Sequence, residues 1–347
     1  MNEYPLILFT SFLILGKMLN SDELKNEPQV VLIPNNTIPV PAPMDCNSPV
    51  FWADGQIYMF NSEGFPRRSN GTSLSQLTDT IQCQWDGPPG KTWWIEAVWK
   101  DPKTGILYGW YHHEPKNLPC APRTAPKIGA IISQDNGTTW KDQGFVLENG
   151  YPIDTSYDNG FFVGGNGDFH VILDRGKKYF YFLFSNYGGP VSEQGIGLAR
   201  SSFKNKGQPG TVFKYFNGSW KEGGLGGQVT PIFPTPTGWK GPDTFDCYWG
   251  PSIHWNTYLK QYVVVLNRTI RHGWAGDAIY IAYSDDLFHW TAPKPFYRAT
   301  GEFDWYPLII GIKKNETDTR CGQEGRLFIR NQSKYSIRFL KDGEKGL

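Results

Sequence analysis

The stretch that decides the fold is residues 44–60, MDCNSPVFWADGQIYMF. Its second residue is an acid, Asp45, which lies five residues before a short apolar run at residues 50–52. A turn made of Asp54 and Gly55 then leads into a second apolar run. Asp-Gly between two apolar runs is the strongest short-range signal for a β-hairpin. We therefore predict two short antiparallel strands, preceded by a carboxylate at the end where the first strand starts.

The same pattern of apolar run, Asp/Gly/Asn turn and second apolar run recurs four more times, beginning near residues 93, 167, 248 and 305. These starts lie roughly 50 to 80 residues apart, farther than the ~40–50 residues of a regular propeller blade, so loops must be inserted. The longest insertion is the Gly-rich segment 204–243. No long stretch has the helical period of 3.6 residues, which predicts low helix content. The repeat predicts an all-β protein, a five-bladed β-propeller with antiparallel four-stranded blades.

Two turn sequences support a propeller. Residues 133–140, SQDNGTTW, match the "Asp box" Ser-x-Asp-x-Gly-x-Thr-Trp, and residues 284–290, SDDLFHW, are a looser version. We expect Asp135 to bond backbone amides, Gly137 to adopt a positive φ, and Trp140 to pack between blades. The motif indicates a propeller and does not by itself indicate a sialidase. A sialidase-type site would also need several arginines, and the arginines do not fall at the starts of the repeats.

Composition limits the function classes. The chain has 347 residues, of which 39% are hydrophobic and 19% charged, so a large core is expected and disorder is not. We expect one propeller domain over residues 41–340 and a monomer. Aromatic residues make up 16%, including 14 Trp, which suits both a β core and the stacking of sugar rings. The net charge is +1 without a basic block, so no nucleic-acid partner is expected.

The N-terminal segment predicts export. Its apolar run at residues 4–16 is too short for a confident membrane span and suits a signal peptide, although no Lys or Arg precedes it. We predict a signal peptide at 1–20, a linker at 21–40, a secreted or extracytoplasmic location, and no membrane attachment after cleavage. Seven Asn-x-Ser/Thr sequons agree with export, at Asn35, Asn70, Asn136, Asn217, Asn267, Asn315 and Asn331.

The five cysteines do not form a metal-binding pattern. They are Cys46, Cys83, Cys120, Cys247 and Cys321, without a Cys-x-x-Cys pair, so a zinc site is not expected. Disulfides would be compatible with export, but the sequence does not pair them.

Three features together carry a family resemblance: Asp45 before its apolar run, the Ser-x-Asp-Leu-x-x-Trp turn, and Trp249-Gly250-Pro251-Ser252. They resemble the five-bladed β-propeller glycosidase superfamily, which includes arabinanases, β-xylosidases and invertases. The resemblance covers about residues 40–335 and does not select a family within the group. It implies a glycoside hydrolase acting on a plant or algal type of oligo- or polysaccharide.

In that superfamily, an Asp on the first blade is general base or nucleophile, a second Asp orients and tunes, and a Glu on a later blade is general acid. Glycoside hydrolysis needs such a set because one carboxyl must donate a proton while another stays ionised. The matching positions here are Asp45, Glu96 and Asp168, near the starts of the first three repeats. A Glu such as Glu96 between apolar residues is hard to explain as core, because burying it unpaired is costly.

The order Asp–Glu–Asp departs from the superfamily's Asp–Asp–Glu, which leaves the general acid open. Glu96 could be a binding residue instead. Other candidates for the proton donor are Glu114, Asp246, His112, His113 and His170.

We expect a second group of residues to bind the sugar: Trp94, His113, His170, Trp249, Asp246 and Arg67. The tryptophans would serve as stacking platforms. No cofactor and no metal is predicted, although a structural Ca²⁺ occurs in the channel of some relatives. The alternative hypothesis is a non-catalytic glycan-binding propeller, in which aromatic residues line the channel mouth without convergent carboxylates.

Overall fold

The computed structural model describes residues 27–87, 92–116, 118–119, 121–241, 246–270, 274, 276–299 and 304–344. The predicted signal peptide and Cys120 lie outside these residues. In this part, the chain is all-β, with single-turn 3₁₀ segments η2 (Leu74–Gln76) and η3 (Val191–Glu193). None of its helical segments has the length and apolar character needed to cross a membrane.

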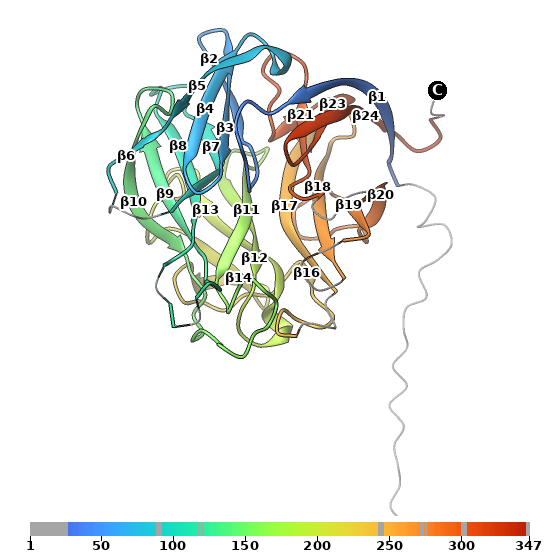
Figure 1. Ribbon diagram of the computed structural model, residues 1–347. Helices are drawn as coiled ribbons and strands as arrows, with labels where there is room; N and C mark the ends of the chain where they lie inside the picture. Colours follow the sequence, from blue (N-terminus) through green and yellow to red (C-terminus); the bar gives the residue numbers. More distant parts are fainter. Residues whose placement is uncertain are drawn as a thin grey trace, which may run out of the picture.

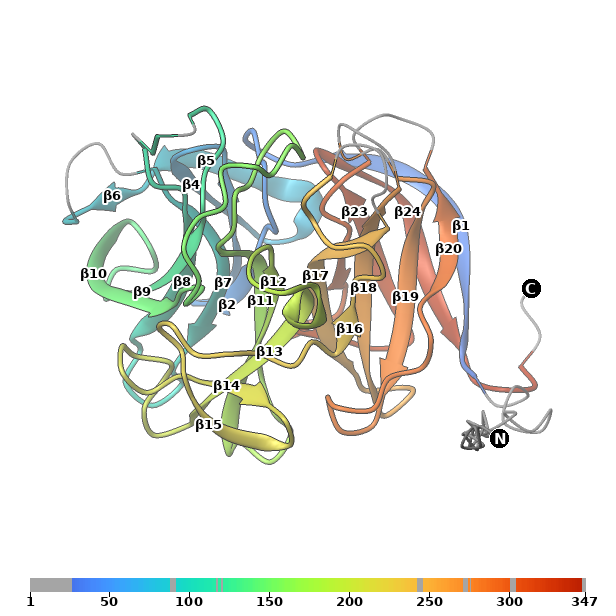
Figure 2. The ribbon, with the colours of Figure 1, turned by 90° about the horizontal axis from the view of Figure 1, so that it is seen from below.

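Five sheets surround a common axis and form a five-bladed β-propeller, which confirms the predicted fold (Figures 1 and 2). In the first four blades, the chain supplies the four principal strands in order, from the innermost strand outward. Blade I contains β2 (Val50–Ala53), β3 (Gln56–Ser62), β4 (Pro66–Gly71) and β5 (Leu77–Gln82). Blade II contains β7 (Trp94–Lys100), β8 (Leu107–His113), β9 (Lys127–Ser133) and β10 (Thr139–Leu147), with β6 (Gln84–Trp85) parallel to β10.

Blade III includes the Gly-rich insertion, part of which is ordered as strands. The blade contains β11 (Asn166–Leu173), β12 (Tyr179–Asn186), β13 (Gly195–Ser202), β14 (Phe213–Phe216), β15 (Ser219–Gly223) and β16 (Phe233–Pro234). Blade IV contains β17 (Cys247–Asn256), β18 (Gln261–Thr269), β19 (Ala278–Ser284) and β20 (Lys294–Arg298), with β22 (Arg320–Cys321) parallel to β17.

Blade V closes the ring with strands from both ends of the chain. It contains β21 (Leu308–Gly311), β23 (Glu324–Ile329), β24 (Gln332–Leu340) and, as its outermost strand, β1 (Gln29–Pro39). Both ribbon views show β1 beside β24, and the two pair antiparallel from Gln29↔Leu340 onward. The structure thus places residues 29–39 of the expected linker within the last blade.

Apolar side chains between neighbouring blades form the core. One cluster joins blades II and III through Trp110, Phe180 and Phe182, all buried. Comparable clusters lie between the other neighbouring pairs. A sixth cluster, rich in aromatic rings, lies at the end of the axis where the inner strands begin, and includes Trp249 and Trp274.

The Asp-box turns adopt the expected geometry. Asp135 Oδ1 accepts the amides of Thr138 and Thr139 at 3.0 and 2.9 Å. Gly137 has φ +85°, and buried Trp140 lies edge-on to Phe60 of blade I with ring centroids 5.6 Å apart. The local sequence of the turn therefore fixes how blade II meets blade I.

Candidate active site

A cavity of about 60 Å³ lies on the propeller axis, and all five blades contribute to it near the starts of their inner strands. Its titratable lining residues are Asp45, His112, Glu114, Asp168 and Tyr306. The remaining lining residues are aromatic: Trp94, Phe161, Phe162, Trp249, Trp274 and Trp305. Carboxylates inside an aromatic enclosure suit a ligand with apolar faces and polar edges, as a sugar has.

Asp168 reaches this cavity from a β-bulge. The pairing of β11 with β12 skips it, since Gly167 faces Ser185 and Phe169 faces Phe184. Asp168 has φ +37°, a conformation that is uncommon for a residue with a side chain. A bulge re-aims a side chain away from the regular alternation of a strand. Local backbone strain of this kind clusters at functional sites, where the surroundings hold it in place.

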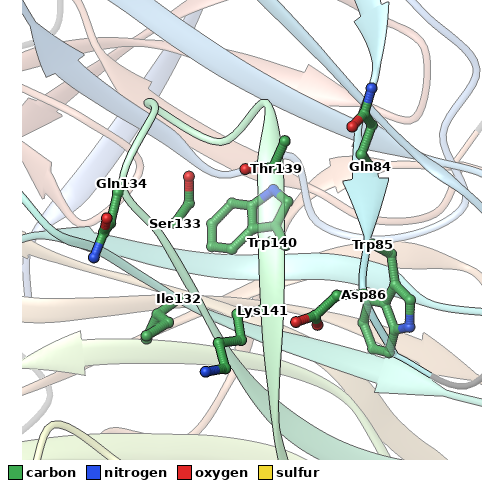
Figure 3. Close-up of a pocket in the computed structure, with 9 residues that line it drawn as sticks. All are labelled: Gln84, Trp85, Asp86, Ile132, Ser133, Gln134, Thr139, Trp140 and Lys141. Carbon is green, nitrogen blue, oxygen red and sulfur yellow. The ribbon is translucent and has the colours of Figure 1, made fainter.

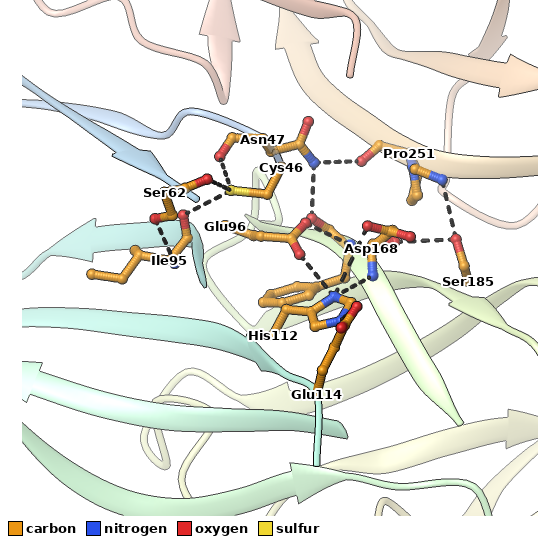
Figure 4. A network of polar contacts seen from close by, with 12 residues as sticks. Cys46, Asn47, Ser62, Ile95, Glu96, His112, Glu114, Asp168, Ser185 and Pro251 are labelled. Carbon is orange, nitrogen blue, oxygen red and sulfur yellow. Dashed lines mark hydrogen bonds and ion pairs between the residues drawn. The ribbon is translucent and has the colours of Figure 1, made fainter. Parts of the chain in front are cut away.

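Side chains of blade II hold the two amides of the bulge (Figure 4). The Asp168 amide donates to Nδ1 of His112 at 3.1 Å, and the Phe169 amide donates to Oε2 of Glu96 at 3.0 Å. Glu96 is fully buried and itself lies in a bulge of β7, between Ile95 and Ala97. Glu96 therefore lies beneath the cavity wall and acts on the backbone that carries Asp168.

The carbonyl groups of the bulge are bonded as well. Ser185 Oγ donates to the carbonyl oxygen of Asp168 at 3.2 Å, and Asn47 Nδ2 donates to that of Phe169 at 2.9 Å. The same Asn47 amide donates to the carbonyl oxygen of Pro251 at 3.0 Å. Blades I to IV are thus tied together at the level of the bulge.

The two cavity aspartates differ in their surroundings. Burial raises the pKa of Asp168 to about 7, an effect that the nearby Glu96 charge strengthens and His112 opposes. The Tyr187 hydroxyl group donates to Oδ2 of Asp168. Asp45 lies at the rim: the residue as a whole is exposed, but protein atoms around its carboxyl group partly desolvate it and raise its pKa, and the charge of Arg330 opposes that rise. A carboxyl that holds its proton near neutral pH can serve as an acid, while an exposed carboxylate can serve as a base or nucleophile.

The carboxyl group of Glu96 and the backbone amide of Asp168 both approach Nδ1 of His112. Burial lowers the pKa of His112, but Glu114, Glu96 and the charge of Asp168 outweigh it and raise the pKa well above its usual range. Glu96 Oε1 lies 3.2 Å from Nδ1 and Glu114 Oε1 lies 3.5 Å from Nε2. The Asp168 amide, in contrast, can only donate, so its bond requires Nδ1 without a proton. One ring cannot satisfy both at once.

Glu96, His112 and Asp168 are also the residues whose chemistry could suit a cation. One ligand atom from each lies within 4.8 Å of the others. However, the His112 nitrogen nearest the two carboxylates already accepts the Asp168 amide, and Glu96 Oε2 accepts the Phe169 amide. We therefore describe the three as a hydrogen-bonded cluster.

The structure brings together five of the residues predicted from the sequence. Asp45, Asp168, Trp94 and Trp249 line the cavity, and Glu96 lies directly behind Asp168. Trp249 is buried and touches the rings of Trp274 and Trp305 edge-on, with centroids 4.9 and 5.5 Å away.

Four predicted sugar-binding residues lie outside the cavity lining, and three of them have other partners. His113 Nδ1 lies 2.6 Å from the Thr92 carbonyl oxygen, and the ring stacks on Phe145. His170 is fully buried and bonded to Asp318. Asp246 receives two bonds from Arg268, and Arg67 is exposed on β4.

Sequence reasoning missed most of the aromatic wall. Phe161, Phe162, Trp274, Trp305 and Tyr306 come from loops, which have no periodicity to predict their direction. His112 and Glu114 were considered only as alternative proton donors. The only available signal was the local density of aromatic residues in these loops.

A larger cavity, of about 390 Å³, lies at the outer edge of blade II beside the Asp-box turn (Figure 3). Its single carboxylate, Asp86, already accepts the amide of Asp142 at 2.8 Å. It offers no pair of carboxyl groups and therefore does not compete with the axial cavity as a hydrolytic site.

Comparison with known proteins identifies the fold. No protein-family model and no curated protein sequence matches the chain. Among solved structures, it is similar to a candidate exo-β-1,3-galactanase from Bifidobacterium bifidum s17, with a TM-score of 0.52 and 12% identity over 88% of this chain and 93% of that chain. It is also similar to an endo-arabinase from Bacteroides thetaiotaomicron VPI-5482, with a TM-score of 0.50 and 13% identity over 89% and 97% of the two chains.

A third similar structure is the catalytic domain of a GH62 α-L-arabinofuranosidase from Coprinopsis cinerea. Its TM-score is 0.50, with 11% identity over 92% of this chain and 97% of that chain. At such identities the likeness establishes a shared fold. It thus confirms, at the level of the fold, the predicted resemblance to five-bladed β-propeller glycosidases.

Proposed function

We propose that the protein is a glycoside hydrolase whose reaction takes place in the axial cavity. The observation that carries this proposal is that Asp45 and Asp168, from different blades, line one aromatic cavity while their environments differ. Pairs of carboxyl groups held in different protonation states are the requirement for glycosidic bond cleavage. The names of the similar structures, which include galactanase and arabinase activities, support the same class.

In this proposal Asp168 is the general acid. Its pKa of about 7 keeps a proton available in mildly acidic to neutral solution. Because Tyr187 occupies Oδ2, the other oxygen, Oδ1, is the one that delivers the proton to the leaving oxygen. Asp45 acts from the rim as base or nucleophile. Glu96, which cannot reach the cavity, supports Asp168 from behind.

The lining of the cavity favours a neutral sugar at a chain end. None of the described residues that line it is a Lys or Arg, so the described lining itself carries no counter-charge for a uronic or sialic acid; Arg330 acts only on Asp45 at the rim. All five blades contribute to its wall, which favours a terminal residue over an internal one. The remaining chain would leave past the rim, where Phe161 and Trp305 are partly exposed. Location outside the cell remains part of the proposal, on the basis of the N-terminal sequence.

A substrate screen tests the proposal directly. The protein should release chromophore from at least one of the aryl α- or β-galactosides, arabinofuranosides, xylosides or fructosides. Asp45→Asn and Asp168→Asn should each lower kcat by about 10³-fold or more, since removing an acid or a base costs roughly 10²–10⁴-fold. Both substitutions preserve side-chain size, so the thermal transitions should show that the variants are folded.

The glycan-binding alternative gives a different result. In that case the protein would bind an oligosaccharide in calorimetry without releasing product, and Asp45→Asn would leave the affinity unchanged. That combination would refute the hydrolase.

A further inference from the structure

His112 is the group in the cavity whose role the proposed function leaves open. It is 4% exposed and comes from β8, one strand outside the inner strand of blade II. It lies beside both buried carboxyl groups of the cluster and close to Glu114 at the rim. A histidine in this position could transfer protons, carry a charge, or hold another residue.

The backbone of Asp168 needs an external partner. Its amide points away from the β12 ladder because the bulge removes Asp168 from the register. A buried amide without an acceptor is strongly unfavourable, so nearly all such groups are paired. The acceptor for this amide is Nδ1 of His112, at 3.1 Å.

The same contact fixes the direction of the Asp168 side chain. Residues with positive φ are held only where the surroundings determine them, and Asp168 has φ +37°. If the amide loses its acceptor, the peptide plane between Gly167 and Asp168 can rotate, and the carboxyl group turns with it. A displacement of 1 Å at a reacting group can cost about 10²-fold in rate.

We propose that His112 is a positioning residue: its neutral ring accepts the Asp168 amide at Nδ1, carries its proton on Nε2 towards Glu114, and so aims the Asp168 carboxyl group into the cavity. The surrounding carboxyl groups raise the pKa of His112 and so favour the imidazolium. In this proposal the bond to the buried Asp168 amide outweighs them, because protonation of Nδ1 would turn that nitrogen towards Glu96 Oε1 and leave the amide without its acceptor. The ionisable groups facing the ring are Glu96 on β7, Glu114 after β8 and Asp168 on β11. Asp45 also contributes to the same electrostatic environment from the rim.

Two variants of His112 distinguish the contribution of its hydrogen-bond acceptor from the contribution of its ring shape. In His112→Asn, Oδ1 is as many bonds from the backbone as Nδ1 of His and can accept the same amide without titrating near neutral pH. In His112→Phe, a ring of similar shape has no acceptor. Since the inference rests on the proposed function, kcat and KM are measured on the aryl glycoside that the wild type cleaves.

We expect His112→Phe to lower kcat about 100-fold with little change in KM, and His112→Asn to recover kcat to within about 10-fold of the wild type. The alkaline limb of the pH profile should stay in place in His112→Asn. If His112→Phe kept wild-type kcat, or His112→Asn were as impaired as His112→Phe, the positioning role would be overturned. A rise of the alkaline limb by about one unit in His112→Asn would also overturn it, because it would show that His112 acts through its charge.

A spectroscopic measurement tests the inference without any substrate. Nitrogen NMR of histidine-labelled protein distinguishes the neutral Nε2–H tautomer from the imidazolium, and comparison with His112→Asn assigns the His112 signals. The neutral tautomer at pH 7 supports the proposal, and an imidazolium overturns it. If no glycoside is cleaved, this measurement still decides the role of His112, so the two proposals fail separately.

Discussion

Two histidines of the channel, His112 and His170, have the same bonding pattern and different surroundings. Each accepts, at Nδ1, an amide of the next blade: His112 that of Asp168, and His170 that of Ile253 at 2.8 Å. Each points Nε2 at a carboxylate. For His170 that partner is Asp318, 2.9 Å away and buried, whose other oxygen accepts the Val50 amide.

The pair of His170 and Asp318 is therefore closed, because each of these contacts joins a donor to an acceptor. The group around His112 is open, because Glu96 Oε1 has no hydrogen-bond partner and Glu114 is 3.5 Å away and 35% exposed. A fully bonded buried network makes a structure rigid, while an incompletely bonded one keeps groups available for chemistry. The completeness of the bonding thus separates the structural histidine from the candidate functional one.

The largest expected effect on folding comes from opening the closed pair. Asp318→Ala removes the acceptor of both His170 Nε2 and the Val50 amide, and each buried donor left without an acceptor costs about 1–3 kcal/mol. Urea unfolding at pH 7 should show the loss. Glu324→Ala provides a matched control, because its partner Arg338 is partly exposed and such a pair is worth about 0–1 kcal/mol. Equal losses in the two variants would contradict the comparison.

A substitution at Asp168, in the open group around His112, should increase the stability of the folded protein instead of lowering it. The pKa of Asp168 is raised to about 7 in the folded protein, against about 3.9 when unfolded, so the folded state binds the extra proton between these values. Its contribution to stability is therefore present at low pH and is lost as pH rises from about 4 to 7. Asp168→Asn removes this decrease in stability, because the amide does not ionise. Its side-chain oxygen can still accept the hydrogen bond from Tyr187, and Asn is one of the residues that adopt a positive φ most readily.

We accordingly expect Asp168→Asn to be more stable than the wild type at pH 8, by up to about 4 kcal/mol, and no more stable at pH 4. Urea unfolding at the two pH values measures the difference. An advantage of the same size at both pH values would show that burial does not hold the proton on Asp168.

The sequence predicted the parts of the molecule that local patterns determine. The hairpins, the Asp-box turns and the position of Asp45, Glu96 and Asp168 near the starts of inner strands follow from short motifs that recur. It could not choose between His112 and His113. Adjacent residues of a strand face opposite sides, and the side depends on a register that the bulge at Glu96 shifts.

The sequence also could not predict which side chains pair with one another across different strands. Asp246 was predicted to bind sugar, yet it pairs with Arg268 of the adjacent strand. His170 is hydrogen-bonded to Asp318, which lies 148 residues away in the sequence. The pairing of His170 with Asp318 depends on how the blades close into a ring, which no local pattern encodes.

The smallest expected effect concerns the aromatic wall, which also belongs to the open end of the channel. Trp305 lies edge-on to Trp249 at the partly exposed rim, where a sugar ring can contact it. Loss of one aromatic contact costs about 1–1.5 kcal/mol, so Trp305→Ala should raise KM about 10-fold and leave kcat nearly unchanged. Arg67→Ala is the control, because Arg67 was predicted to bind sugar but does not line the cavity. If Arg67→Ala raised KM as much as Trp305→Ala did, the substrate would extend over blade I, and the axial cavity would describe only part of the binding site.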